Sequence, residues 1–288
     1  MKIFIKLTVC NFFEMVNAVI LAGGRRGEYM KKDNWIYRKL FGRIIPGEEK
    51  SVRIYKGKPL VSHVINALKS SKTIDDIVVG GNTFLLKEAG INDVKCLEQG
   101  NTMIENVMIG YNYFKRQGYR EKILLAPCDI PEIGGDSIDE FVEKAREGDF
   151  CLAVGDKKFL GEYDGIFRRF YFWVLKDGER KKYRISNLSI AKPDAIGNKE
   201  MVEYAFSLRK IMWPGNWPNI AKELGWKSFF DYLRLKLTFE YLEERFSDKF
   251  GCDFRIIEIC DPAVSFDLDH NRDSRKLRKW HKLKKIKA

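Results

Sequence analysis

The sequence predicts an α/β protein: a doubly wound, mostly parallel sheet of Rossmann type, with a helical insertion in its C-terminal half. Three observations support this fold class. Short apolar runs alternate with longer amphipathic stretches, as strands alternate with helices in such sheets. The short runs are almost continuously apolar, which is typical of parallel strands that are buried on both faces. Residues 199–250 depart from this alternation and carry a mainly helical pattern.

The composition is that of a globular chain of 288 residues, of which 45% are hydrophobic. No stretch reaches the roughly 18 uninterrupted apolar residues of a membrane span. The six cysteines form no C-x-x-C pair, which favours reduced, buried thiols in the cytoplasm and argues against a zinc site. We interpret residues 1–15 as a leader or an upstream start, with Met15 as the natural beginning.

The net charge of +12 comes from 52 basic and 40 acidic residues. Eight of the basic residues lie in the last fourteen positions, so two thirds of the excess belongs to the C-terminal tail. We interpret residues 274–288 as a solvated basic helix or tail. Nucleic acid or an anionic surface is the less favoured partner for it. The remaining excess fits a protein that handles anionic small molecules.

The first strand is predicted at residues 16–22 and ends at two adjacent glycines, Gly23 and Gly24. Adjacent glycines let the backbone turn sharply and approach a ligand closely. Arg25 and Arg26 follow and place positive charge beside the exposed N–H groups. We therefore expect phosphate to bind here, with an ordinary glycine turn and solvated arginines as the alternative.

Residues 28–57 are charged and irregular, and we expect a flap or a small hairpin over the site. Gly57–Leu60 opens an amphipathic helix, with Pro59 in its first turn. Another helix is predicted to begin at Gly100–Thr102, where free N–H groups would form a second contact for an anion or a base. Further strands are expected at residues 77–80, 94–97, 123–126, 151–154, 254–259 and 264–269.

The second half of the chain predicts a hairpin around Asp177–Gly178, formed by residues 171–175 and 181–190. The aromatic residues of the 199–250 helices are expected to pack in the core between helices. The predicted organisation is a core of residues 16–198 that includes the hairpin, a helical insertion at 199–250, a return to the core at 251–273, and the basic end.

Carboxylates close two of the predicted strands. Asp129 lies between two prolines at one strand end, and Asp267 and Asp269 end another strand. Carboxylates brought together at the mouth of a buried strand repel one another unless a cation lies between them. Mg²⁺ suits such a place, because it is usually held by one or two carboxylates and by substrate phosphates. The alternative for each carboxylate is a helix cap or a turn, and it is strongest for Asp269.

Four blocks of the sequence resemble the signature blocks of the molybdenum-cofactor-guanylyltransferase-like NTP transferases, which are nucleotidyltransferases of the GT-A fold. The blocks are Leu21–Gly24, Gly57–Leu60, Cys128–Pro131 and Asp267–Asp273. They follow the order of the family over about residues 16–277. Residues 99–106 and the strand that contains Asn187 are similar to a branch with a helical C-terminal part.

The resemblance implies roles for residues at matching positions. Nucleotide binding falls to Leu21, Ala22, Gly23, Gly24, Arg25, Lys58, Gly100, Asn101 and Thr102. Asp129 and Asp269 match the two ligands of Mg²⁺ or Mn²⁺, and Asp267 is a secondary candidate. Asn187 is a weak candidate on the acceptor side.

The glycine loop departs from the pattern of the family. It reads Arg25-Arg26-Gly27-Glu28-Tyr29-Met30-Lys31-Lys32, where the family usually has Ser/Thr, any residue, Arg, Met, Gly and then Lys. Arg26 or Lys32 is expected to supply the catalytic cation beside Asp129. Arg25 and Lys31 stay open as alternatives.

The implied activity is magnesium-dependent transfer of an NMP group from an NTP to a phosphorylated sugar, polyol or cofactor, with release of pyrophosphate. One alternative is a GT-A glycosyltransferase that uses a nucleotide sugar, although the basic glycine loop suits a triphosphate better. The other is a non-catalytic protein that binds nucleotides or RNA. The acceptor, the preferred base and the oligomeric state do not follow from the sequence.

Overall fold

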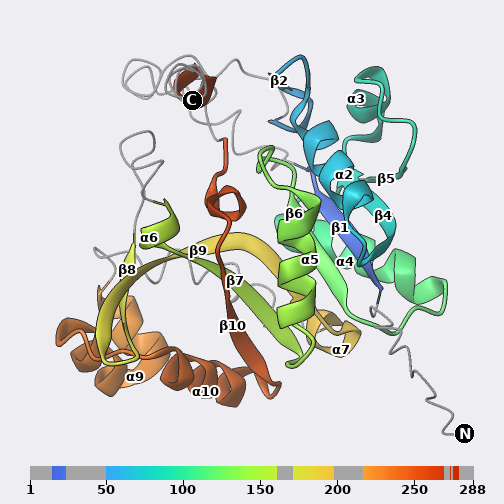
Figure 1. Ribbon diagram of the computed structural model, residues 1–288. Coiled ribbons are helices and arrows are strands. Elements are labelled where there is room, and N and C mark those ends of the chain that lie inside the picture. The colour runs from blue at the N-terminus through green and yellow to red at the C-terminus, as the bar shows by residue number, and fades with distance from the viewer. Residues whose placement is uncertain are drawn as a thin grey trace, which may run out of the picture.

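The computed structural model describes residues 15–23, 50–160, 171–197, 217–268, 273 and 275–278, with backbone alone at 160, 197 and 217–224. Its centre is an eight-stranded sheet in the order β10-β7-β9-β6-β1-β4-β5, with β8 paired to β9 (Figure 1). The strands are β1 (Val16–Leu21), β4 (Ile74–Gly81), β5 (Lys95–Glu98), β6 (Ile123–Pro127), β7 (Phe150–Asp156), β8 (Phe172–Lys176), β9 (Glu179–Ala191) and β10 (Phe254–Ile259).

The sheet is mostly parallel, as predicted. β1 lies at its centre, parallel to β4 on one side and to β6 on the other, with Ala18 opposite Ile77 and Leu124. β9 runs antiparallel to both of its neighbours, β6 and β7. The residues Ala18, Val19 and Ile20 have no exposed surface, which explains why this strand reads as a continuous apolar run.

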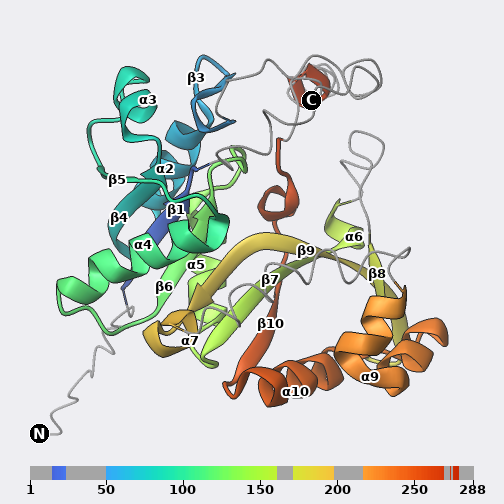
Figure 2. The ribbon, with the colours of Figure 1, turned by 180° about the vertical axis from the view of Figure 1, so that it is seen from behind.

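Helices cover both faces of the sheet. α2 and α5 pack together on one face, and α4 packs against β1 and β4 on the other (Figures 1 and 2). The helices are α2 (Leu60–Ser70), α3 (Thr83–Glu88), α4 (Met103–Arg116), α5 (Gly135–Lys144), α6 (Lys157–Leu160), α7 (Pro193–Gly197), α9 (Trp217–Leu233) and α10 (Phe239–Phe250). Two buried clusters, one on each face, therefore share the sheet as their common wall.

The predicted hairpin is present as β8 and β9. Its turn residues Asp177 and Gly178 have φ angles of 54° and 76°, as a two-residue turn of type I′ requires. The described part of the helical insertion consists of α9 and α10, joined by a turn and irregular chain at residues 234–238. α10 packs against β10. The ring centres of Phe239 on α10 and Tyr183 on β9 are 4.6 Å apart.

Two aromatic side chains of the insertion differ from the prediction. Trp226 and Phe230 are 67% and 47% exposed, whereas Tyr232 is buried. α9 has only a weak amphipathic pattern and is interrupted by Gly225, where φ is 85°. Exposed and buried aromatic positions on this helix are therefore not separated by a regular spacing in the sequence. Trp213 lies outside the described residues, as does the side chain of Trp217.

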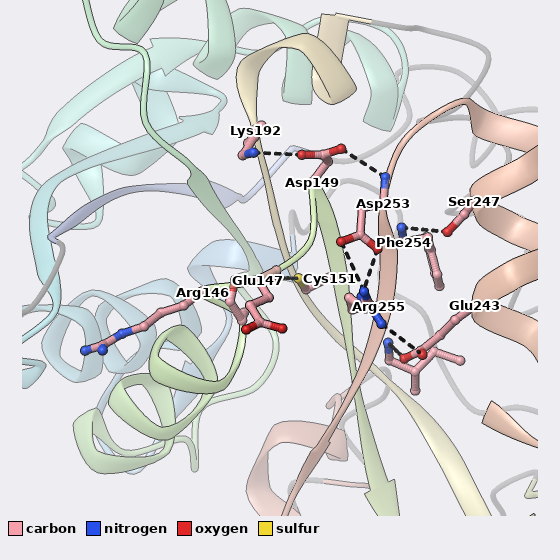
Figure 3. A network of polar contacts seen from close by, with 12 residues as sticks. Arg146, Glu147, Asp149, Cys151, Lys192, Glu243, Ser247, Asp253, Phe254 and Arg255 are labelled. Atoms are coloured by element: carbon pink, nitrogen blue, oxygen red, sulfur yellow. Dashed lines mark hydrogen bonds and ion pairs between the residues drawn. The ribbon is translucent and has the colours of Figure 1, made fainter. Parts of the chain in front are cut away.

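A polar network joins the amino ends of β7 and β10 (Figure 3). Asp149 pairs with Lys192 at 2.8 Å and accepts a hydrogen bond from the Asp253 N–H group at 2.9 Å. The bond from Lys192 lowers the pKa of the Asp149 carboxyl group. Arg255 pairs with Asp253 at 2.8 Å and lies 3.8 Å from Glu243 of α10. Burial raises the pKa of Glu243. The network therefore fastens α10 to the sheet.

Two predicted elements differ from the structure. Lys58–Pro59 forms a short strand, β3, paired with β2 (Ile54–Tyr55), so that α2 begins only at Leu60. Residues 264–269 were predicted as a strand, but Pro262–Ser265 forms a 3-10 helix, η3, followed by extended chain. Asp261 favours this helix because its carboxylate accepts a hydrogen bond from the Ala263 N–H group at 2.8 Å.

The two ends of the chain are described in part. Residues 273 and 275–278 of the predicted basic helix are helical, and residues 1–14 and 279–288 lie outside the described residues. Of the predicted flap, residues 50–59 form a 3-10 turn, η1 (Lys50–Val52), and the β2–β3 hairpin. In the described part of the chain, no helix has the length and hydropathy that a membrane span requires.

The contact between α4 and β1 generates a first prediction. A Cβ atom added at Gly110 would lie 2.5 Å and 2.6 Å from the two methyl groups of Val19. Because both residues are buried, Gly110→Ala should force α4 away from β1 and destabilise the fold by about 1–3 kcal/mol. The midpoint of urea unfolding measures this change. Gly134→Ala is the control, because its added Cβ atom would meet nothing closer than Ser137 Oγ at 4.0 Å. Equal stability of the two variants would contradict the prediction.

Candidate functional site

At the carboxyl ends of the central strands, the backbone hydrogen bonds between neighbouring strands continue past the last strand residue. The Ala22 N–H group donates to Gly80 O at 2.8 Å, and the Cys128 N–H group donates to Leu21 O at 3.2 Å. Gln99 extends the next strand in the same way, by donating to Gly81 O at 3.0 Å. The loops that follow β1, β5 and β6 therefore begin side by side at one edge of the sheet. Open α/β sheets bind their ligands at this edge.

Gly23 makes a close approach to two polar side chains. A Cβ atom at this position would lie 2.5 Å from Gln99 Oε1 and 2.5 Å from Asn106 Nδ2. The glycine is therefore required because the backbone passes directly against these two amides. The neighbouring candidates of the glycine loop, Gly24, Arg25, Arg26, Lys31 and Lys32, lie outside the described residues.

The turn before α4 is held by side chains of the helix that it precedes. Asn106, which is 2% exposed, accepts a hydrogen bond from the Gly100 N–H group at 2.8 Å. Glu105 accepts one from the Asn101 N–H group at 2.6 Å, and Thr102 Oγ1 caps the helix by accepting from the Glu105 N–H group at 3.1 Å. The expectation of free N–H groups here is therefore wrong for Gly100 and Asn101. The side chains of Asn101 and Thr102 are exposed.

One backbone hydrogen bond brings the two aspartate segments together. The Leu268 N–H group donates to Asp129 O at 2.8 Å. Asp267 and position 269 flank Leu268, so the end of β6 and the segment after η3 lie side by side at the same edge of the sheet. Asp269 itself lies outside the described residues.

Asp129 and Asp267, the two aspartates of these segments that the structure describes, each pair with a basic side chain. The Asp129 carboxylate forms an ion pair with Lys50 Nζ, and Asp267 pairs with Arg184 of β9 at 2.8 Å. The Asp129 side chain is 14% exposed and that of Lys50 is 31% exposed. Because a half-buried carboxylate is costly without a counter-charge, each cation stabilises its partner. Among the described residues, no three His, Cys, Asp or Glu side chains group as metal ligands.

Sequence reasoning missed Lys50 and Arg184. Lys50 lies in the stretch that was interpreted only as a flap, and its position follows from the hairpin behind it. Tyr55 Oη and Lys56 Nζ both bond Glu132 Oε1, at 2.7 Å and 2.8 Å, and so fix the hairpin to the loop after β6. The available signal in the sequence was the Lys56-Gly57 pair, which favours a tight hairpin turn. In the structure these two residues have φ values of 46° and 81°, and the hairpin directs the preceding residues toward the strand ends.

Two further predicted residues, Lys58 and Asn187, lie near this edge. Lys58 is exposed on β3 opposite Tyr55. Asn187 lies on β9, two residues before Ser189 in the sequence. Ser189 pairs with Leu125 of β6, which runs antiparallel to β9. Asn187 is half-buried and level with the carboxyl end of β6. Both roles stay predictions.

Comparison with known proteins agrees with this geometry. Residues 18–189 match the family model of the MobA-like NTP transferase domain. No curated protein sequence matches the chain. A hypothetical transferase from Thermus thermophilus is similar in structure, with a TM-score of 0.66 and 20% identity, over 90% of this chain and 99% of the other.

Two further solved structures share the fold at lower identity. One is a CMP:2-keto-3-deoxy-manno-octonic acid synthetase in complex with CTP, with a TM-score of 0.55 and 10% identity, over 94% of this chain and 99% of the other. The other is a 4-diphosphocytidyl-2C-methyl-D-erythritol synthase from Anaerococcus prevotii, with a TM-score of 0.54 and 12% identity, over 93% of this chain and 96% of the other.

The Asn106 contact generates a second prediction. Asn106→Ala removes the buried acceptor of the Gly100 N–H group, so the turn should loosen and this amide should exchange its hydrogen about tenfold faster or more. Hydrogen exchange followed by NMR measures this change. Asn82→Ala is the matched control, because Asn82 caps α3 by accepting from the Leu85 N–H group at 3.1 Å. Unchanged exchange at Gly100 in Asn106→Ala would refute the role given to this side chain.

Proposed function

This chain belongs to the family of MobA-like NTP transferase domains, and on that premise we propose that it transfers an NMP group from an NTP to a phosphorylated small-molecule acceptor. Members of this family are nucleotidyltransferases, and so is this enzyme. The observation that carries the finer proposal is the meeting of Asp129, Lys50 and residues 267–268 at the strand ends, next to the end of β1.

The arrangement of the edge supports an orientation for the nucleotide. The backbone of Leu21–Gly23 and the turn at Gly100–Thr102 would hold the base and the ribose, since they adjoin each other through Gln99 and Asn106. The triphosphate would then extend toward the end of β6. Gly24, Arg25, Arg26 and Lys32 follow directly on this turn in the sequence, and we propose that they contact the phosphates, with Lys58 as a further candidate.

The proposed reaction needs no nucleophilic side chain. An oxygen of the acceptor attacks the α-phosphorus of the NTP, the bond from that phosphorus to the bridging oxygen breaks, and pyrophosphate leaves. Positioning and electrostatic stabilisation supply most of the catalysis in such transfers. Lys50 is the more exposed partner of its ion pair, so its ammonium group can reorient from Asp129 to a phosphate oxygen. We therefore add Lys50 to Arg26 and Lys32 as the catalytic cation.

The proposal includes a divalent cation, Mg²⁺ or Mn²⁺, held by Asp129 and Asp269. The Leu268 bond supports this proposal, because it brings residue 268, the sequence neighbour of Asp269, against Asp129. One or two carboxylates suffice, since phosphate oxygens and water complete the shell of magnesium. Asp267 is the weaker candidate because Arg184 already holds it. When bound, the cation would neutralise charge on the phosphate oxygens.

We propose a sugar, polyol or cofactor phosphate as the acceptor, with Asn187 on its side of the site and the cytoplasm as the compartment. The five described cysteines are free thiols, which supports a reducing compartment. A glycosyltransferase would release a nucleoside diphosphate instead of pyrophosphate. Incubation with each NTP, Mg²⁺ and a panel of phosphorylated acceptors, with assay of both products, tests the proposal. A binding protein would release neither product.

The role of Asp129 generates a third prediction. Asp129→Asn keeps the size of the side chain and removes its charge, so pyrophosphate release should fall about a hundredfold or more while the fold persists. Pyrophosphate assays and circular dichroism measure the two effects. Asp93→Asn is the control, because Asp93 forms an exposed ion pair with Lys69 at 2.5 Å. Full turnover in Asp129→Asn would end the proposed role of this carboxylate.

The role of Lys50 generates a fourth prediction. Lys50→Ala should lower turnover by roughly a hundredfold, because a fixed positive charge beside the phosphates is lost. Lys50→Arg keeps the charge and should recover part of the rate. Lys144→Ala removes a lysine that is ion-paired with Glu140 on α5, and it should leave turnover unchanged. If Lys50→Ala and Lys144→Ala are equally active, the catalytic cation lies elsewhere, with Arg26 and Lys32 as the next candidates.

A further inference from the structure

A second basic feature lies away from the candidate site. A hollow of about 660 Å³ opens between α6 and the β8–β9 hairpin. Its wall carries five cationic side chains: Lys157, Lys158, Arg180, Lys181 and Lys182. α6, which lines the hollow, directly follows the carboxyl end of β7, and the aspartate segments lie at the same edge of the sheet (Figure 1).

The acidic residues of the wall are engaged within the protein. Asp156 accepts a hydrogen bond from the Lys158 N–H group at 2.8 Å and so starts α6. Glu258 pairs with Lys176 at 2.5 Å and accepts a bond from Tyr183 Oη at 3.2 Å. Glu179 is exposed at the hairpin turn. Lys181 also pairs with Asp177 at 3.5 Å. The wall nevertheless keeps an excess of positive charge, because its five basic side chains outnumber its three carboxylates, and Glu258 is already paired with Lys176.

The cationic side chains of the wall contact aromatic rings. Lys182 Nζ lies 4.3 Å from the centre of the Trp173 ring, and Lys158 Nζ lies 5.9 Å from that of Phe159. Within the described part of the chain, Lys158, Arg180 and Lys182 form no ion pair. Aromatic faces hold a cation in place without neutralising it. The hollow thus presents positioned positive charge to a ligand.

β9 connects the hollow with the candidate site. Arg180, Lys182 and Arg184 are alternate residues of this strand and so share one face. Arg184 is the residue that pairs with Asp267, next to the Leu268 bond with Asp129. β9 has a register shift between Ile185 and Ser189, so the span from Lys182 to Asn187 matches only three to four residues of β7, roughly 10–14 Å. A line of cations therefore leads from the hollow toward the reaction site.

We propose that the hollow binds a second anionic group of the acceptor, a phosphate or carboxylate roughly 10–14 Å from the group that reacts. The proposal rests on the proposed nucleotidyl transfer, since that reaction defines where the acceptor is attacked. The acceptor is then an extended molecule with at least two anionic groups. A compact monophosphate would reach the reaction site and leave the hollow empty.

Trp173 allows a local test of binding, with inorganic tripolyphosphate as the probe. A bound anion should draw the Lys182 ammonium group away from the Trp173 ring and so change tryptophan fluorescence, and the change should reach a plateau as probe is added. Trp173→Phe should abolish that change. The variant Lys158→Gln/Arg180→Gln keeps the Lys182–Trp173 contact that gives the signal, and it should weaken binding of the probe by about tenfold or more, because two charge-assisted contacts are lost. The control Lys95→Gln/Lys115→Gln removes equal charge, including a lysine 5.4 Å from the Tyr111 ring. Its affinity should match the parent protein.

Two results would overturn the proposal: no emission change that depends on Trp173, or equal affinity of the hollow and control variants. Repeating the titration with citrate separates carboxylate from phosphate as the preferred group. NTP binding is measured separately by equilibrium dialysis. If NTP binds and Trp173 stays silent, the hollow proposal fails alone. If the probe binds at Trp173 and no NTP binds, nucleotidyl transfer fails, and with it the assignment of the hollow to an acceptor.

Discussion

The hydrogen bond between the Leu268 N–H group and the Asp129 carbonyl group is the contact on which the site depends. It joins the end of β6 to a segment that returns only after the hairpin and the helical insertion. Neighbouring contacts hold that segment in place: Ser186 Oγ donates to Val264 O at 2.6 Å, Ser137 bonds Asp261, and Arg184 pairs with Asp267. Two of these contacts come from β9 and one from α5, so the placement of Leu268 depends on elements from both halves of the chain.

Electrostatics imposes the second constraint on this edge. Asp129 and Asp267 lie at strand or segment ends where water reaches them only in part, and each is compensated by a long basic side chain. The two ion pairs differ in how far their basic side chains are exposed. Arg184 is 12% exposed and projects from the middle of β9, whereas Lys50 is 31% exposed and lies ahead of a short hairpin. The Arg184–Asp267 pair therefore suits a structural role, whereas the Lys50–Asp129 pair suits exchange of partners during a reaction.

The central strands and the Asp177–Gly178 hairpin could be predicted because their signals are local. A strand that is buried on both faces must be apolar, and a type I′ turn needs residues that tolerate positive φ. Lys50 and the 264–268 segment could not be predicted in this way. The position of Lys50 depends on contacts of Tyr55 and Lys56 with Glu132, 76 or more positions later. The apolar residues of the segment resemble a strand, yet Asp261 and Pro262 start a short helix there. The position of Lys50 is thus decided by a partner that is distant in sequence, whereas the 264–268 segment is decided by a local cap that the apolar pattern conceals.

The network at the amino ends of β7 and β10 has a consequence for how this protein can vary. It binds α10 through Arg255 and Glu243 at the end of β7 opposite to Asp156, about 20 Å away along the strand. At the other end of β7, Phe239 of the same helix packs on Tyr183, which lies opposite Asp156. The insertion is therefore held at both ends of the strand, so a change in α10 can be carried along the full length of β7.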